Sequence, residues 1–485
     1  MFEQEFEANV KPTEEIKKNA GPPNRMNNLP YKEWMKFQKS FFRVSGYKDL
    51  YRDFATFFTK EKWDNGKQSE SLFLSGQETG FSSPDQRRIE IYNDVTDDKK
   101  LFFYLTGAKK NKRCFDFILV NLDSLDQRSL MRVFSRSSEL AELTRSVLAE
   151  NKYCCFLLSQ DKGSTNCWQF SSLLRGKLKL KDEKIGISQD SDVILNCMIF
   201  QSADDLRHQP FNTDITLSDK GSTNFSSWII PKSRPRKKNE ILHPAKFPEP
   251  LIEEFIKLFS KESDNIFDPM AGTGSTVVAA VESKRNGYGI ELMEEFASVA
   301  KSRVQASTSS NTLFEDHTKK VIGKIVLGNA KDILEINAFD GISFDYCVTS
   351  PPYWSMLSNK GSENQKKRRD KNLKLTYSED HKHDLGNIES YDLFVDELVT
   401  IYNHIAEKLN KGSVLTIIVK NVKRDHTVYP LAWDLIFKLC AKGQKYSFLG
   451  TTMWCQDDIG LKPFAVGIHW VSNTLHQYCL HLERK

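Results

Sequence analysis

The segment 265–291 constrains the fold more than any other part of the 485-residue chain. It reads as a short apolar strand over 265–268, a glycine-rich turn, a helix over 275–283, and a second strand over 286–291 that ends in a carboxylate. Glycine lets the backbone approach a ligand closely, and the helix that follows offers N–H groups without intrahelical partners. A carboxylate at the end of the second strand can hold both hydroxyls of a ribose. The segment therefore predicts a nucleoside-binding site at one end of a parallel sheet.

A second motif follows an apolar strand predicted over 344–349, where the chain reads Ser350, Pro351, Pro352 and Tyr353. Two prolines in succession fix the backbone and remove two N–H donors, so neighbouring carbonyl groups can face a ligand as rigid acceptors. Ser350 adds a side-chain oxygen, and Tyr353 adds a flat ring for stacking. The motif predicts a cradle for a planar amine, while the alternative interpretation is an ordinary rigid turn.

Together, these two motifs resemble those of the DNA amino-methyltransferases, which methylate an exocyclic nitrogen of a base with S-adenosylmethionine. The glycine turn and the acid resemble motifs I and II of that family. No Lys-Ser or Lys-Thr follows the glycines, so a P-loop NTPase is not indicated. The resemblance implies that cofactor binding involves Phe247, Asp268, Pro269, Met270, Ala271, Gly272, Thr273, Gly274, Glu291 and Asn329.

Two of these positions come from further segments that resemble the same family. The stretch 243–248 resembles motif X, which wraps the methionine end of the cofactor, and it contributes Phe247. The stretch 324–330 resembles motif III, where the family mostly has Asp and this chain has Asn329. An amide oxygen can still accept a hydrogen bond from the adenine amine. Met270 also replaces the usual Phe, which exchanges one large apolar side chain for a more flexible one.

The resemblance implies that Ser350, Pro351, Pro352 and Tyr353 are catalytic and that the target base is flipped out of the duplex. The Ser-Pro-Pro-Tyr form favours N4 of cytosine, whereas Asp or Asn in the first position is commoner for N6 of adenine. N6-adenine methylation needs the same cradle and stays an alternative. Enzymes that methylate a protein glutamine usually carry Asn at this position. A catalytically silent DNA-binding subunit of a modification system is a further alternative, which the intact motifs disfavour.

The order of the motifs predicts a continuous catalytic domain over 241–485. We expect a Rossmann-like class I methyltransferase fold, an α/β architecture with a mostly parallel seven-stranded sheet and an antiparallel terminal hairpin. Strands are expected near 265–268, 286–291, 324–327, 344–349, 412–420, 446–454 and 474–482. Helices are expected near 249–259, 275–283, 293–304, 390–410 and 429–441.

The first half of the chain divides into a polar N-terminal arm over 1–40, an α/β domain over 41–230 and a basic linker over 231–240. Its Phe115-Asp116 strand parallels the later Phe344-Asp345 strand. This domain is predicted to be either a degenerate methyltransferase half or a domain that recognises DNA. Its predicted strands are Leu101–Thr106, Phe115–Leu122, Tyr153–Ser159 and Val193–Gln201, and its predicted helix is Gln127–Glu150.

Composition adds limits on partners and compartment. A net charge of +5 is compatible with nucleic acid, and nine cysteines without a Cys-x-x-Cys pair favour reduced thiols. We expect no metal site, and no apolar run is long enough to span a membrane. The acidic start is unlike a signal peptide, which favours a cytoplasmic location. The resemblance implies a bacterial or archaeal protein that associates with the nucleoid through DNA. Double-stranded DNA is the expected partner, and the resemblance allows a cognate restriction endonuclease. The residues predicted to bind DNA are Trp354, Lys366, Lys367, Arg368 and Arg369.

Overall fold

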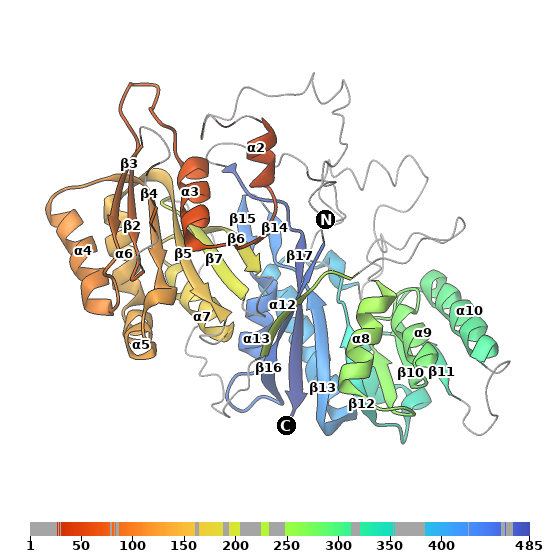
Figure 1. Cartoon of the computed structure of the whole chain (residues 1–485). Coiled ribbons are helices and arrows are strands. Elements are labelled where there is room, and N and C mark those ends of the chain that lie inside the picture. The colour runs from red at the N-terminus through yellow and green to blue at the C-terminus, as the bar shows by residue number, and fades with distance from the viewer. Residues whose placement is uncertain are drawn as a thin grey trace.

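Two α/β units, each built on one large sheet, lie side by side in the computed structural model (Figure 1). The N-terminal unit runs from red to yellow in that figure, and the C-terminal unit from green to blue. The structure describes residues 27, 29, 31–77, 80–81, 83, 87–160, 164–187, 194–203, 225–231, 248–311, 321–352, 354, 384–424, 426–456, 461 and 469–485.

The C-terminal sheet has the strand order β11-β10-β9-β12-β13-β17-β16-β8. Strand β17 is antiparallel to both of its neighbours, and the other pairs are parallel. All seven predicted strands and the antiparallel terminal hairpin are therefore confirmed. The bounds are β8 Phe225–Ile229, β9 Asn265–Asp268, β10 Asn286–Glu291, β11 Gly323–Leu327, β12 Phe344–Thr349, β13 Leu409–Val419, β16 Tyr446–Cys455 and β17 His476–Arg484.

The predicted seven-stranded sheet was wrong by one strand. Strand β8 pairs in parallel with β16 at the edge of the sheet, so the sheet has eight strands. This strand precedes residue 231, and it therefore belongs to the C-terminal sheet although the sequence placed it in the N-terminal domain. The signal was missed because Phe225–Ile229 is short, carries two serines and lies apart from the motif-bearing segments.

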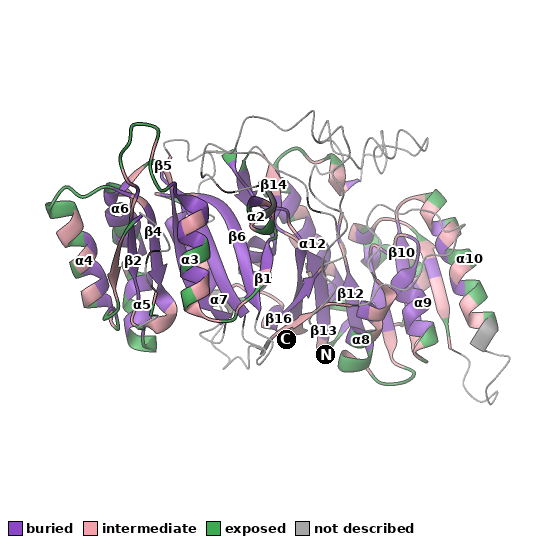
Figure 2. Ribbon diagram, turned by 45° about the horizontal axis from the view of Figure 1, so that its top comes forward, coloured by how far each residue is buried: buried purple, intermediate pink, exposed green. Residues whose placement is uncertain are grey.

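Helices cover both faces of the C-terminal sheet. Ile266 of β9 packs with α8 and α9 on one face, whereas the adjacent Phe267 packs with α12 and α13 on the other. This alternation follows from the two-residue period of a strand, and it buries both faces of the central strands (Figure 2). The five predicted helices are confirmed as α8 Glu249–Phe259, α9 Ser275–Glu282, α10 Glu294–Asn311, α12 Tyr391–Lys408 and α13 Leu431–Leu439. Shorter elements are η3 Ala330–Glu335, η4 Asn337–Phe339, η5 Leu385–Asn387 and the hairpin of β14 Val422–Arg424 and β15 Thr427–Tyr429.

The N-terminal sheet has the order β1-β6-β7-β5-β4-β2-β3. Three of its four predicted strands are confirmed, as β4, β5 and β7. The strand bounds are β1 Phe41–Arg43, β2 Glu70–Leu74, β3 Arg88–Tyr92, β4 Phe115–Asn121, β5 Leu148–Ser159, β6 Lys179–Ile187 and β7 Ile194–Gln201. The helices are α2 Tyr31–Lys36, α3 Tyr47–Phe58, α4 Asp98–Lys110, η1 Leu122–Ser124, α5 Gln127–Ser135, α6 Ser137–Val147 and α7 Ser164–Leu174.

The strand predicted over Leu101–Thr106 was wrong, because this segment lies inside helix α4. The Asp97 side chain caps the helix by accepting a hydrogen bond from the backbone N–H of Lys100. The single helix predicted over Gln127–Glu150 is also wrong in detail. It breaks at Arg136, whose φ of −111° is not helical, and its last three residues already belong to β5.

The two sheets share strand order and direction over seven strands. The strands of the two sheets correspond one to one when the sheets are aligned as β3-β2-β4-β5-β7-β6-β1 and β10-β9-β12-β13-β17-β16-β8. Corresponding strands come in the same sequence order in each unit, and corresponding pairs are parallel or antiparallel alike. Only β11 has no counterpart. The pairing of β4 with β5 shifts register between Phe115 and Phe117, and that of β12 with β13 shifts between Phe344 and Tyr346.

One hydrogen bond is repeated in both units as well. The Asp116 carboxylate accepts from the backbone N–H of Glu70 at 3.0 Å, and the Asp345 carboxylate accepts from that of Asn265 at 2.8 Å. In each unit the acid sits near the start of one strand and holds the first residue of the next strand in the sheet. The parallel noticed between the two Phe-Asp strands thus extends to the whole sheet.

Candidate active site

The glycine turn joins the end of β9 to the start of α9. Gly272 and Gly274 have φ angles of +54° and +80°, in the left-handed region that favours glycine. A Cβ atom on Gly274 would also lie 3.0 Å from the Cβ of Ala300 in α10. Glycine at these two positions therefore lets the chain turn sharply from the strand into the helix.

Asp268, predicted to bind the cofactor, lies beneath the turn and is fully buried. Its carboxylate accepts hydrogen bonds from the hydroxyl of Thr276 at 2.6 Å, the hydroxyl of Thr349 at 2.8 Å and the backbone N–H of Met270 at 3.0 Å. Burial raises its pKa to about 6. These contacts tie β9 to α9 and to the last residue of β12, so Asp268 supports both motifs from below.

Glu291, at the end of β10, holds the turn from the other side. Its two carboxylate oxygens accept from the backbone N–H of Gly272 at 2.8 Å and from that of Met293 at 2.9 Å. Burial raises the pKa of Glu291 to about 7, although these two hydrogen bonds act in the opposite direction. The acid is thus fixed in the pocket wall next to the glycine turn.

A single pocket brings the two motifs together. It encloses about 920 Å³ of space, a figure that includes its open mouth. Gly274 and Asp268 do not line it, while Phe247, Tyr353 and residues 366–369 lie outside the described residues. The predicted residues that line it are Pro269, Met270, Ala271, Gly272, Thr273, Glu291, Asn329, Ser350, Pro351 and Pro352.

Asn329 lines the pocket at the end of β11 and also begins η3. Its side-chain oxygen accepts from the backbone N–H of Lys331 at 3.0 Å. A carbonyl oxygen has two lone pairs and an amide nitrogen carries two hydrogens, so the side chain retains capacity for a ligand. The Asn found here instead of Asp is therefore compatible with binding an adenine amine.

The pocket also contains residues that the sequence did not single out. Several are neighbours of predicted residues in the sequence, and their positions just after the strands could have identified them as pocket residues. Asp384 and Leu385 lacked such a signal, because they lie far along the chain from Ser350 and precede α12. Asp384 caps η5 by accepting from the backbone N–H of Gly386 at 2.8 Å. The additional lining residues are Ser275, Leu292, Met293, Phe296, Gly328, Ala330, Asp384, Leu385 and Ile401.

Trp354, predicted to contact DNA, is 3% exposed. Its indole N–H donates to the carbonyl of Ile388 at 3.0 Å, and its ring packs against Tyr391 and Tyr429 at centroid distances of 5.2 and 4.7 Å. The structure therefore places Trp354 in an aromatic cluster inside the protein and does not present it to DNA. The prediction of DNA contact fails because the large apolar surface of the indole ring favours burial among other side chains.

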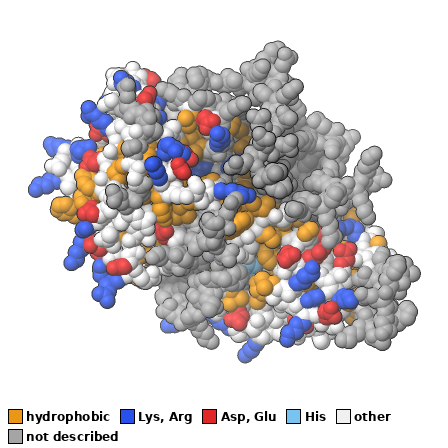
Figure 3. All heavy atoms as spheres, in the orientation of Figure 1, with side chains coloured by type: hydrophobic (Ala, Val, Ile, Leu, Met, Phe, Trp, Pro, Cys, Tyr) orange, Lys and Arg blue, Asp and Glu red, His pale blue; other side chains and the backbone are white. Residues whose placement is uncertain are grey.

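Positive charge is not concentrated over the described part of the face in Figure 3, where Lys and Arg are interspersed with Asp and Glu. The predicted basic loop at 366–369 lies outside the described residues. Among the residues that the structure does describe, no group of three His, Cys, Asp or Glu side chains could hold a metal ion. Within the same ranges, no helix combines the length and apolarity needed to cross a membrane. None of the nine cysteines forms a disulfide, and Cys347 is buried in the sheet as expected.

The family model that matches the chain is described as DNA methylase and covers residues 29–302. The matched stretch includes the N-terminal sheet, the glycine turn and Glu291, and it ends before Ser350. It covers more than half of the 485 residues. The match also supports the expectation that S-adenosylmethionine is the cofactor.

Curated relatives agree with this family over shorter stretches. The orphan methyltransferase M.BamHII of Bacillus amyloliquefaciens is 36% identical over 84 residues, which are 17% of this chain and 32% of the relative. The type II methyltransferase M.ScaI of Streptomyces caespitosus is 31% identical over 107 residues, 21% of this chain and 35% of the relative. The chain thus spans about a third of the length of these relatives.

Among solved structures, magnesium protoporphyrin IX methyltransferase (ChlM) from Synechocystis PCC 6803 with bound SAM is 10% identical. The alignment covers 49% of this chain and 79% of that chain, with a TM-score of 0.27, and similarity at this level carries no inference about function. The family match is the stronger finding, because it covers the whole N-terminal sheet and the part of the C-terminal sheet that carries the glycine turn. On that finding, the chain belongs to the DNA methylase family.

Proposed function

We propose that the chain transfers a methyl group from S-adenosylmethionine to the exocyclic N4 amine of a flipped-out cytosine in DNA. The observation that carries this proposal is the shared pocket. Ser350, Pro351 and Pro352 line the same cavity as Gly272 and Glu291. A cofactor cradle and an amine cradle that meet in one cavity support a direct transfer between two ligands.

The polar groups that line the pocket are compatible with the hydrogen-bonding groups of the cofactor. Glu291 can accept from the two ribose hydroxyls, and Asn329 can accept from the adenine amine. The turn at Gly272 leaves room for the backbone to approach the ligand. When bound, S-adenosylmethionine supplies an electrophilic methyl group on a sulfonium sulfur.

The remaining chemistry falls to the motif at the end of β12. The exocyclic nitrogen of cytosine is a poor nucleophile, because its lone pair is delocalised into the ring. Hydrogen bonds from its N–H groups to the Ser350 hydroxyl oxygen and the Pro351 carbonyl would favour a pyramidal nitrogen. Its lone pair could then attack the methyl carbon in line as the bond from that carbon to sulfur breaks, and the methylated nitrogen would release one proton to solvent. Tyr353 would stack on the base. Positioning and electrostatics supply the catalysis in this scheme.

Cytosine is proposed over adenine on the basis of Ser350, because the Ser-Pro-Pro-Tyr form resembles the N4-cytosine enzymes. N6 of adenine presents the same kind of amine, so the cradle alone would accept either base. A cognate restriction endonuclease and the target sequence stay predictions drawn from the family resemblance.

We infer that the N-terminal unit is a methyltransferase-type domain without a cofactor site of its own. Gly76, at the end of β2, donates its N–H to the Ser124 hydroxyl at 2.9 Å, and a Cβ there would lie 2.6 Å from the carbonyl oxygen of Val95. Asp123, which follows β4, accepts from the backbone N–H of Ser159 at 2.9 Å. Its own side chains therefore fill the strand ends where a ligand would bind. No Pro-Pro pair follows β4.

The test is nucleoside mass spectrometry of unmethylated plasmid DNA after incubation with the chain and S-adenosylmethionine. The proposal predicts N4-methylcytosine, which chromatography separates from its C5 isomer of equal mass. N6-methyladenine would preserve the fold and the chemistry and overturn the choice of base. The absence of any methylated base from a reaction in which the cofactor binds would contradict the proposal.

A further inference from the structure

Trp354, which comes directly after the four residues of the catalytic motif, belongs to an aromatic cluster. Trp354, Tyr391 and Tyr429 pack together, with the Tyr391 and Tyr429 rings 5.0 Å apart between centroids. The guanidinium of Arg424 lies 5.0 Å from the Trp354 ring centroid. Trp354 is four residues beyond Ser350, so the position of this cluster constrains the path of the chain as it leaves β12 through the motif.

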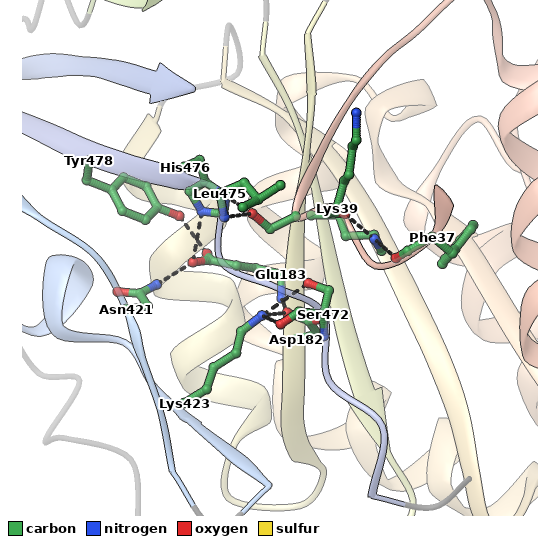
Figure 4. Close-up of polar contacts among 12 residues, drawn as sticks. Phe37, Lys39, Asp182, Glu183, Asn421, Lys423, Ser472, Leu475, His476 and Tyr478 are labelled. Atoms are coloured by element: carbon green, nitrogen blue, oxygen red, sulfur yellow. Dashed lines mark hydrogen bonds and ion pairs between the residues drawn. The ribbon is translucent and has the colours of Figure 1, made fainter. Parts of the chain in front are cut away.

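The N-terminal unit reaches this cluster through the β14–β15 hairpin. Asp182, on β6 and fully buried, accepts a hydrogen bond from the Lys423 ammonium at 2.5 Å, as Figure 4 shows. The same ammonium donates to the Ser472 carbonyl at 2.9 Å. Although burial acts to raise the pKa of Asp182, the positive charges of Lys423 and Lys184 hold it below its usual value. Lys423 immediately precedes Arg424, which lies over Trp354.

The adjacent acid of β6 makes a second set of contacts with the same region. Glu183 accepts from the Asn421 amide at 2.6 Å and from the Tyr478 hydroxyl at 2.5 Å (Figure 4). The Asn421 oxygen accepts in turn from the backbone N–H of Ala432 at 3.0 Å. These two acids of β6 therefore hold the start of the stretch between β13 and α13 directly, at Asn421 and Lys423. They hold its end indirectly, because Asn421 is bonded to Ala432.

An independent contact enters from α7. Arg175, which directly follows this helix, lies 3.6 Å from the carboxylate of Asp434 in α13, and both side chains are buried. Asp434 also accepts from the Tyr391 hydroxyl at 2.7 Å. Because the Tyr391 ring packs on Trp354, this path ends on the same cluster as the β6 contacts.

We propose that Asp182 and Glu183 of β6, together with Arg175, are positioning residues that orient Ser350 and Pro351 through the Trp354 cluster. In this proposal the N-terminal unit supports the residues of the amine cradle. It can do so without binding a ligand of its own. The cofactor side of the pocket, at Gly272 and Glu291, is supported from within the C-terminal unit and does not depend on these contacts. Only the predicted effect on catalysis rests on the proposed function, whereas the predicted effect on the position of Ser350 does not.

The test compares Asp182→Asn and Tyr391→Phe with wild type and with Asp98→Asn. Asp98 is a buried acid of the N-terminal unit that pairs with Arg132, away from the interface, so it controls for a general loss of stability. Hydrogen–deuterium exchange is measured in peptides that contain Ser350 and Trp354. Calorimetry gives the cofactor Kd, and steady-state methylation gives kcat and KM.

Asp182→Asn and Tyr391→Phe should both exchange faster in these peptides and lose about tenfold in kcat, since a small misplacement of reacting groups is costly. Their cofactor Kd should stay within about twofold of wild type, because the contacts to the cofactor are unchanged. Asp98→Asn should match wild type in exchange at these peptides. If Asp182→Asn and Tyr391→Phe also match wild type in exchange, the proposal is overturned. Because the exchange measurement needs no turnover, it decides the matter even if wild type methylates no DNA, a result that would refute only the proposed function.

Discussion

At the scale of single residues, the buried carboxylate of Glu291 should make cofactor binding depend on pH. Burial raises its pKa to about 7, so the carboxylate is protonated in a growing fraction of molecules as the pH falls from 8 to 6. Only the ionised form offers all its lone pairs to the ribose hydroxyls. We therefore predict that cofactor affinity, measured by calorimetry, falls towards low pH, by up to about tenfold for each unit below 7.

The matched control is Glu291→Gln, which keeps the shape of the side chain and removes its titration. Titration of the methionine amine of the cofactor is common to both proteins, so the difference between the two profiles reports the carboxylate. Parallel profiles for wild type and the variant between pH 6 and 8 would contradict the assignment of Glu291 to the ribose.

At the scale of elements, the turn between β9 and α9 should decide cofactor binding. In Gly272→Val, a branched side chain must adopt a φ of +54° at the pocket wall. Strain of this kind costs about 1–2 kcal/mol, and the free protein can relieve it by moving the turn out of its binding conformation. Restoring that conformation on binding would then weaken the affinity by up to about tenfold. Calorimetry should show this loss. Gly341→Val is the control, because Gly341 has a φ of +71° in open space and lies outside the pocket. Equal cofactor affinity in both variants would argue against the turn assignment.

The same elements explain how much the sequence could predict. Each motif is a strand followed by a turn, and the residue types in the turn are explained by local backbone geometry. The glycine turn, Glu291 and Ser350 could therefore be placed at one end of the sheet from the sequence alone. Helix α4 could not, because its Leu-Phe-Phe-Tyr-Leu run has high strand propensity. Its helical spacing becomes evident only in the structure, where Leu101 and Leu105 are buried and Phe103 is 71% exposed. Tertiary packing overrode the local preference.

Asp384 and Trp354 illustrate what local sequence could not supply at the site. Asp384 reaches the pocket from the start of the segment before α12, and nothing in its neighbours links it to Ser350. Trp354 follows the motif directly, so its position suggested DNA contact. Its burial depends on Tyr391 and Tyr429, which come from other elements, and only their packing reveals that role.

At the scale of the whole molecule, two similar sheets raise the question of how many cofactors bind. We predict one per chain. The strand ends of the N-terminal sheet are occupied by Ser124 and by Asp123, which bonds to Ser159. The described residues between β2 and β3 also contain no helix whose N-terminus could meet a ligand. Calorimetric titration of the wild type should give a stoichiometry of one, and Gly272→Val should weaken binding at that single site. Two equivalents in wild type would refute the inference that the N-terminal unit lacks a site.

The central claim is that one pocket joins a cofactor cradle to an amine cradle headed by Ser350. The most direct measurement is methyl transfer to DNA by wild type and Ser350→Ala at saturating cofactor. Losing one hydrogen bond to the reacting amine should lower kcat by about 10- to 100-fold, while the cofactor Kd stays unchanged. A Ser350→Ala protein that methylates DNA at the wild-type rate would contradict the claim.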